Sequence, residues 1–317
     1  MDRQVHRLDD FSPMQKVQIV SIIDKRKVLR LLSDATEVAK SFPRLIELEL
    51  LPDESITIVG DTHGDIDMLK KIIGQFLPDS FNQRGERLLF LGDYVDRNEH
   101  DIENINYLLK LMAEVPSRLM MLRGNHEEHY CNLNYGFYDN LVNAGLDEYY
   151  SMYEGVFRLL PVACVIRNLH VFCCHGMVPE LRGAVMLAEI ANVPRASRSE
   201  EWDPITTQLL WNDPSQEEAE FSEPSIRGIG IEMGKRDLDD FLKANGLKLV
   251  IRSHQAFPEG FKLLLGGKVL SIFSTPNYGM AQNDATIARL HGDGRVDILK
   301  AGIDDKEFSI VETMKLS

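Results

Sequence analysis

The chain has 317 residues, of which 44% are hydrophobic and 26% are charged. This is the composition of an ordinary globular protein, so disordered and collagen-like classes are excluded. Its 35 Lys and Arg residues against 49 Asp and Glu residues give a net charge of −14. That balance argues against a protein whose main role is to neutralise a nucleic-acid backbone.

The cysteines and the N-terminus bear on the cellular location. Four cysteines are too few for a disulfide scaffold in a chain of this size, so we expect buried free thiols. The first residues contain no apolar stretch typical of a signal peptide, and nowhere do about 18 apolar residues run together. We therefore expect a cytoplasmic protein that has neither membrane nor nucleic-acid partners.

The first 52 residues are predicted to be a helical segment. Apolar residues between positions 16 and 40 recur mostly at helical spacing, and Pro43 and Pro52 interrupt the pattern. We expect a catalytic core at 53–300 and a short tail at 301–317. No linker or repeat is visible, so the sequence predicts a single domain over residues 1–317.

From residue 55 onward, short runs rich in Leu or β-branched residues alternate with helical patterns. The predicted strands are 55–59, 88–91, 119–122, 171–174, 247–251, 263–265, 269–273, 286–290 and 296–299, and the predicted helices include 66–76 and 102–113. The acidic segment 215–223 is interpreted as a solvated surface loop. Strands alternating with helices favour a layered α/β or α+β fold, in which helices cover a sheet.

Polar residues follow five of the predicted strands directly. The segments are GDTHGD (60–65), GDYVDR (92–97), RGNHE (123–127), HG (175–176) and RSH (252–254). In layered α/β folds, functional groups gather at the carboxyl ends of strands, where the loops converge. A single buried His is more often a structural residue than a ligand, but five strand ends of the same character favour one common site.

Imidazoles and oxygen donors together are typical ligands of Mn, Fe or Zn. The number of candidate ligands exceeds what one tetrahedral ion needs, and Asp93 could bridge two ions. Two metals about 3.5–4 Å apart are the usual arrangement for in-line displacement at phosphorus. They would lower the pKa of a bound water and so supply a hydroxide as the nucleophile.

The same residues carry a family resemblance. GDTHGD, GDYVDR and RGNHE, in this order, resemble the signature of the phosphoprotein phosphatase (PPP) family of serine/threonine phosphatases, similar to the type-1 and type-2A enzymes. The resemblance extends over residues 29–299 and includes CCHG (173–176), LLWNDP (209–214), IRG (226–228), RSHQ (252–255) and STPNY (274–278). It implies the four-layer metallophosphoesterase fold, a central β-sandwich flanked by helices. It also implies hydrolysis of phosphoserine and phosphothreonine monoesters.

The resemblance assigns a role to each candidate site residue. It implies a first metal on Asp61, His63 and Asp93, a second metal on Asp93, Asn125, His175 and His254, a general acid at His126 oriented by Asp96, and phosphate binding by Arg97, Asn125, Arg227 and Tyr278. The implied cofactors are two divalent ions, with Mn²⁺ expected in vitro and Fe or Zn as alternatives. The implied partners are phosphorylated proteins or peptides, together with regulatory subunits that the sequence does not identify.

Several positions depart from the family pattern, and alternatives stay open. Asp65 stands where a neutral amide is common, Asn98 where Gly is usual, and segments 128–134 and 279–284 differ from the eukaryotic enzymes. Arg227 could simply pair with the acidic segment before it, and Tyr278 could be ordinary core. A symmetrical dinucleoside-tetraphosphate hydrolase would share the metal motifs, and a catalytically silent adaptor would share the fold.

Overall fold

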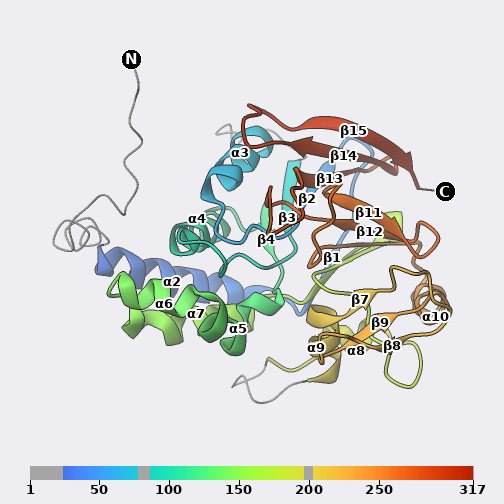
Figure 1. Ribbon diagram of the computed structural model, residues 1–317, viewed down its shortest axis with the longest axis horizontal. Helices are drawn as coiled ribbons and strands as arrows, with labels where there is room; N and C mark the ends of the chain where they lie inside the picture. The colour runs from blue at the N-terminus through green and yellow to red at the C-terminus, as the bar shows by residue number, and fades with distance from the viewer. Residues whose placement is uncertain (1–23, 78–85, 196–202, 317) are drawn as a thin grey trace.

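The computed structural model describes residues 24–77, 86–195 and 203–316. Two six-stranded sheets pack face to face, and helices cover the outer face of each sheet (Figure 1). The described chain is thus built as helix, sheet, sheet and helix layers. The predicted fold class, a β-sandwich flanked by helices, is confirmed.

The first sheet contains the strands whose ends carry the first three motifs. Its order is β15 (Ser309–Lys315), β14 (Arg295–Ala301), β13 (Ala285–His291), β2 (Ser55–Val59), β3 (Glu86–Phe90) and β4 (Leu119–Met121). Strands β2, β3 and β4 run parallel in register, with Val59 opposite Phe90 and Phe90 opposite Met121. Their carboxyl ends therefore lie along one edge of the sheet.

The second sheet contributes two further strand ends. Its order is β1 (Leu45–Leu48), β5 (Ala163–Ile166), β6 (Val171–Cys174), β10 (Leu249–Arg252), β12 (Val269–Ile272) and β11 (Phe261–Leu264). Strands β6, β10 and β12 are parallel. Buried aliphatic side chains of both sheets, such as Ile58 and Ile251, form the core of the sandwich between them.

Helices of the N-terminal half lie beside the first sheet, some against its strands and others against one another. They are α2 (Lys25–Ser41), α3 (Ile66–Phe76), α4 (Asp101–Glu114), α5 (His129–Tyr135), α6 (Phe137–Asn143) and α7 (Tyr150–Leu159). Helices α8 (Leu187–Ala191), α9 (Pro204–Trp211) and α10 (Lys235–Asn245) accompany the second sheet. A third, three-stranded sheet has the order β7 (Asp213–Pro214), β9 (Ile231–Met233) and β8 (Glu223–Pro224). Short 3₁₀ helices occupy Asn125–Glu127, Asp147–Tyr149 and Arg167–Leu169.

Two predicted segments need correction. The segment 1–52 is not helical throughout, because Leu45–Leu48 forms β1 and pairs with β5, about 120 residues away; residues 1–23 lie outside the described residues. The segment 301–317 is not a tail either. Residues Ser309–Lys315 form β15, the edge strand of the first sheet, which pairs antiparallel with β14.

Other expectations from the sequence hold with small changes. The predicted strands appear, each with ends within two residues of the prediction, and the helix 66–76 is reproduced. All four cysteines are free and buried. The acidic segment is only partly the predicted surface loop, because Ser215 is buried and Glu223 begins β8. Within the described residues, no helix is long and apolar enough to cross a membrane.

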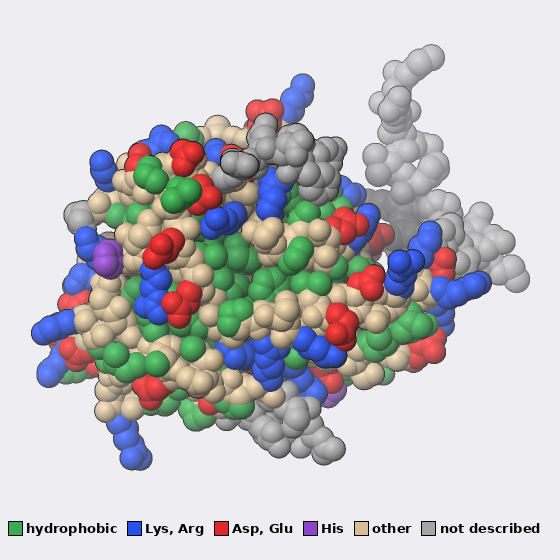
Figure 2. Space-filling view, turned by 180° about the vertical axis from the view of Figure 1, so that it is seen from behind, with side chains coloured by type: hydrophobic (Ala, Val, Ile, Leu, Met, Phe, Trp, Pro, Cys, Tyr) green, Lys and Arg blue, Asp and Glu red, His purple; other side chains and the backbone are tan. Residues whose placement is uncertain are grey.

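The molecular surface is mixed on the face opposite to that of Figure 1. There, Lys and Arg side chains are interspersed with Asp and Glu side chains around apolar areas (Figure 2).

Candidate active site

The five motif loops converge at one edge of the sandwich. Asp61 and His63 follow β2, and Asp93 follows β3. Asn125 and His126 follow β4, His175 follows β6 and His254 follows β10. All seven of these side chains belong to residues that are at most 9% exposed. Parallel pairing within each sheet and the packing of the two sheets therefore bring together residues that are up to 193 positions apart.

A first cluster forms around His63. Its Nε2 atom lies 3.5 Å from Oδ2 of Asp61 and 3.5 Å from Oδ2 of Asp93. The other ring nitrogen, Nδ1, is hydrogen-bonded to the carbonyl oxygen of Val95 at 3.0 Å. This bond holds the ring with Nε2 facing the two carboxylates, as is usual for a metal-binding imidazole.

A second cluster forms around His175. Its Nε2 atom lies 3.3 Å from Oδ1 of Asp93, 2.9 Å from Oδ1 of Asn125 and 3.1 Å from Nδ1 of His254. Asp93 thus directs Oδ2 to the first cluster and Oδ1 to the second. One carboxylate is shared by both groups of donors, which is the arrangement expected of a bridging ligand.

The electrostatics of the clusters fit divalent cations. Burial opposes a charge on His63, but the hydrogen bond to Asp61 and the charge of Asp93 raise its pKa to about 9. The pKa of His175 is also raised, because the charge and hydrogen bond of Asp93 and the charges of Asp61 and Glu127 together outweigh burial, which opposes a charge on the ring. Burial and the nearby Arg227 hold the pKa of His254 well below its usual value, so its lone pair is available. Carboxylates, imidazoles and an amide oxygen together suit Mn, Fe or Zn.

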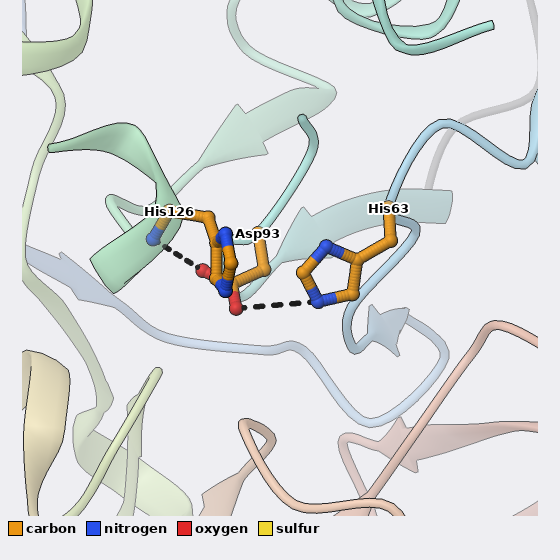
Figure 3. Close-up of side chains that lie close together, drawn as sticks. All are labelled: His63, Asp93 and His126. Carbon is orange, nitrogen blue, oxygen red and sulfur yellow. Dashed lines mark hydrogen bonds and ion pairs between the residues drawn. The ribbon is translucent and has the colours of Figure 1, made fainter. Parts of the chain in front are cut away.

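His126 lies beside the first cluster and is paired with Asp96. Its Nδ1 atom is 2.7 Å from Oδ2 of Asp96, whose other oxygen accepts a hydrogen bond from the backbone N–H of Phe137. Figure 3 shows the side chain of Asp93 beside the rings of His126 and His63, with dashed lines from the backbone N–H of His126 to Oδ1 of Asp93 and from Oδ2 of Asp93 to Nε2 of His63. His63, Asp93 and His126 offer ligand atoms within 4.8 Å of one another.

A cleft of about 870 Å³ is lined by residues of both clusters. The remaining predicted residues, Arg97, Arg227 and Tyr278, also line this cleft. The guanidinium of Arg97 stacks on the ring of Tyr135 at 3.9 Å. Arg227 pairs with Asp213, with Nε 2.7 Å from Oδ2, and still lines the cleft. Its partner is therefore the residue that begins β7, not the acidic segment itself. Tyr278 lines the cleft and stacks on His63, with ring centroids 5.0 Å apart, so it is not ordinary core.

The backbone of the site is locally strained. His63, Asp93, Asp96, Arg97 and His254 all have positive φ angles, between 38° and 73°. Non-glycine residues rarely adopt this conformation, and it is concentrated at functional sites, where the surrounding structure enforces it. Five of the eleven predicted site residues share it, which supports a common functional role for their loops.

Comparisons with known proteins agree with this geometry. Residues 54–258, well over half of the chain, match the family described as calcineurin-like phosphoesterase. The chain belongs to the calcineurin-like phosphoesterases. The resemblance to serine/threonine phosphatases is also borne out, because the relatives carry that name.

Three similar proteins carry the name serine/threonine phosphatase. It is 36% identical, over 70% of its length and 47% of the relative's, to a probable serine/threonine-protein phosphatase of Encephalitozoon cuniculi (strain GB-M1). It is 33% identical, over 86% of its length and 46% of the relative's, to serine/threonine-protein phosphatase 5 of Solanum lycopersicum. A solved Saccharomyces cerevisiae protein serine/threonine phosphatase, with similarity to human phosphatase PP5, superimposes with a TM-score of 0.79 at 29% identity, covering 97% of both chains. The phosphoesterase spans about half the length of the two curated relatives.

Glu127, the last residue of RGNHE, has no role among the predictions made from the sequence. Its fully buried carboxylate accepts three backbone N–H bonds of 2.8 Å, from Asp93, Tyr94 and Gly124. It thereby ties the loop after β3 to the loop after β4. The loops also touch through glycines, because a Cβ on Gly92, whose φ is +124°, would lie 2.5 Å from the Cα of Gly124. The sequence feature that could have indicated this role is an acidic residue at the end of a glycine-containing loop.

Replacing Glu127 with Gln is expected to weaken metal binding by about tenfold or more, the usual effect of losing an outer hydrogen-bonding partner. An amide presents N–H groups to at least one of the three backbone donors, so the two loops lose their fixed spacing. Titration of metal-stripped phosphoesterase with Mn²⁺ measures the change. An unaltered affinity would show that Glu127 does not set the position of Asp93.

Proposed function

We propose that this chain is a metal-dependent serine/threonine protein phosphatase that hydrolyses phosphoserine and phosphothreonine monoesters. The observation that carries the proposal is the pair of buried donor clusters sharing Asp93, placed at the floor of a cleft beside the His126–Asp96 pair. The names of the similar proteins support the same substrate class.

The two clusters would hold two divalent ions. Asp61, His63 and Asp93 would bind the first, and Asp93, Asn125, His175 and His254 the second. Mn²⁺ is the ion that we propose for activity in vitro, and Fe or Zn would fit the same donors. A bound pair of such ions supplies an activated water nucleophile and neutralises charge on the phosphate.

The side chains around the clusters would complete the reaction. His126 would protonate the oxygen of the leaving serine or threonine, since its Nδ1 is held by Asp96 and its Nε2 is left for the substrate. Arg97 and Arg227, which are far apart in the sequence, would both bind phosphate oxygens. Their guanidiniums reach the cleft while Tyr135 and Asp213 hold them in place.

Asn125 and Tyr278 would complete phosphate binding. Asn125 directs its Oδ1 at His175 and lines the cleft, so its side chain lies between the second cluster and the substrate. Tyr278 would border the phosphate from the side of His63, on which it stacks. Phosphorylated proteins or peptides are the substrates that we propose, and regulatory subunits are a further proposal without an assigned surface.

The proposal is tested by adding phosphoserine and phosphothreonine peptides to metal-stripped protein, with and without Mn²⁺. We expect turnover only when the metal is restored. A dinucleoside tetraphosphate, assayed in parallel, is expected to be hydrolysed far more slowly. Preferred hydrolysis of the nucleotide would favour the polyphosphate hydrolase, and stoichiometric metal binding without any turnover would favour a silent adaptor.

A further inference from the structure

The segment that departs from the eukaryotic enzymes, residues 128–134, begins with a carboxylate that the proposed reaction does not use. Glu128 immediately precedes α5, but its side chain makes no capping hydrogen bond to that helix. Instead it accepts a hydrogen bond of 3.0 Å from the indole Nε1 of Trp211, 83 residues away. Its other oxygen lies 3.6 Å from Nη2 of Arg123, and the side chain is only 12% exposed.

Trp211 contacts both Glu128 and the second donor cluster. It is the last residue of α9, is 7% exposed and packs with Cys131 and Leu210 under the cleft. The edge of its indole meets the ring of His254, with centroids 6.0 Å apart and planes at 81°. The indole therefore joins Glu128 to a residue that the proposed function makes a metal ligand.

The ring of His254 lacks the second hydrogen bond that the ring of His63 has, as does His175, whose Nδ1 is also buried without a partner in the described residues. A metal-binding imidazole usually donates its second ring N–H to a carbonyl or carboxylate, which fixes the ring. His63 has this bond, to Val95. Nε2 of His254 is buried without a hydrogen-bond partner in the described part of the chain, and Oδ1 of Asp213 is 4.0 Å away. Packing must therefore orient the ring, between Trp211 and His175.

We propose that Glu128 is a positioning residue: its carboxylate fixes the indole of Trp211, and the indole fixes the ring of His254 for the second metal. The inference rests on the proposed two-metal function. Removing the carboxylate leaves a buried indole N–H without an acceptor, and such a group favours any displacement that finds one. The displaced indole no longer holds His254, so one metal loses a well-oriented ligand while the first cluster keeps its three.

The test is calorimetric titration of the metal-stripped full chain with Mn²⁺. We expect two binding events in the wild type and, in Glu128→Ala, a dissociation constant about tenfold higher for one event only. Glu128→Gln should stay within about threefold of wild type, because an amide oxygen can still accept the indole N–H bond. Trp211→Phe removes the indole N–H donor and part of the ring. Its Mn²⁺ affinities should therefore resemble those of Glu128→Ala.

A double-mutant cycle distinguishes this route from a general effect of the buried charge. In the Trp211→Phe protein, Glu128→Ala should cause no further loss of affinity, because the contact it serves is already absent. Additive losses, or equal losses in Glu128→Gln and Glu128→Ala, would overturn the proposal. The chain has two tryptophans, so in a Trp202→Phe background a changed emission of Trp211 in Glu128→Ala reports the indole directly.

Asp297→Asn is a matched control for the loss of a buried carboxylate. Asp297 is 2% exposed and accepts hydrogen bonds from Thr313 and His291 on neighbouring strands, outside the cleft. Its replacement should leave both Mn²⁺ affinities unchanged. Wild-type affinity in Glu128→Ala would overturn the positioning role alone, whereas a wild-type chain that binds fewer than two Mn²⁺ ions would overturn the two-metal function as well.

Discussion

Replacing His126 with Ala is expected to lower the turnover of a phosphoserine peptide by at least about a hundredfold, with the metal content unchanged. The leaving serine oxygen is a poor leaving group unless it is protonated as the P–O bond breaks. His126 is placed for this step because its Nδ1 is bonded to Asp96 at 2.7 Å, beside the first cluster. Steady-state assays with Mn²⁺, combined with metal analysis of the dialysed protein, measure both quantities.

The metal analysis decides between two roles for His126. Its ligand atom lies within 4.8 Å of those of His63 and Asp93, so geometry alone also allows it to bind a metal. As a general acid it can be removed without loss of metal, whereas as a ligand it cannot. His100→Ala is the control, because His100 is an exposed histidine that pairs with Glu103 outside the cleft, and it should change neither quantity.

The convergence of the site could be predicted from the sequence because each candidate ligand comes soon after the end of a strand. Asp61, Asp93 and Asn125 come two to four residues after β2, β3 and β4, so the parallel register of these strands places them side by side. A strand end and a polar residue are both local features, and local features can be read from a short stretch of chain.

Six strands of the described chain were not predicted, and β1 and β15 illustrate the physical reasons. Strand β1 has only four residues, and its pairing with β5 is determined by tertiary packing rather than by its own pattern. Strand β15 lies at the edge of the first sheet, and most of its residues are exposed. Without one buried face it lacks the alternation of apolar and polar residues by which a strand is recognised.

The supports of the site were also beyond sequence reasoning. The bond between Glu128 and Trp211 joins positions 83 residues apart, and Glu127 binds backbone N–H groups more than 30 residues earlier. The hydrogen-bond donors and acceptors are common residue types. Their local sequence does not indicate which distant residue each of them will contact. The positive φ of Asp93 and Asp96 is likewise imposed by the folded loops, since glycine is the residue that would indicate it.

Replacing Asp93 with Asn is expected to remove metal and activity together, with activity falling by at least about a hundredfold. Loss of an outer partner of a metal site already costs about 10–100-fold, and Asp93 is the residue that we propose as a direct ligand of both ions. Its Oδ2 faces His63 at 3.5 Å and its Oδ1 faces His175 at 3.3 Å. An amide lacks the charge and leaves one of the two clusters facing an N–H donor.

Metal analysis of dialysed Asp93→Asn protein, beside a phosphopeptide assay, checks this expectation. The variant differs from wild type by one atom and one charge, and Asp297→Asn provides the same chemical change at a buried site outside the cleft. If Asp93→Asn retained two metals, the shared carboxylate could not be the bridge between the clusters. A metal content below two ions per chain, with Asp297→Asn unaffected, is what a single ligand common to both sites requires.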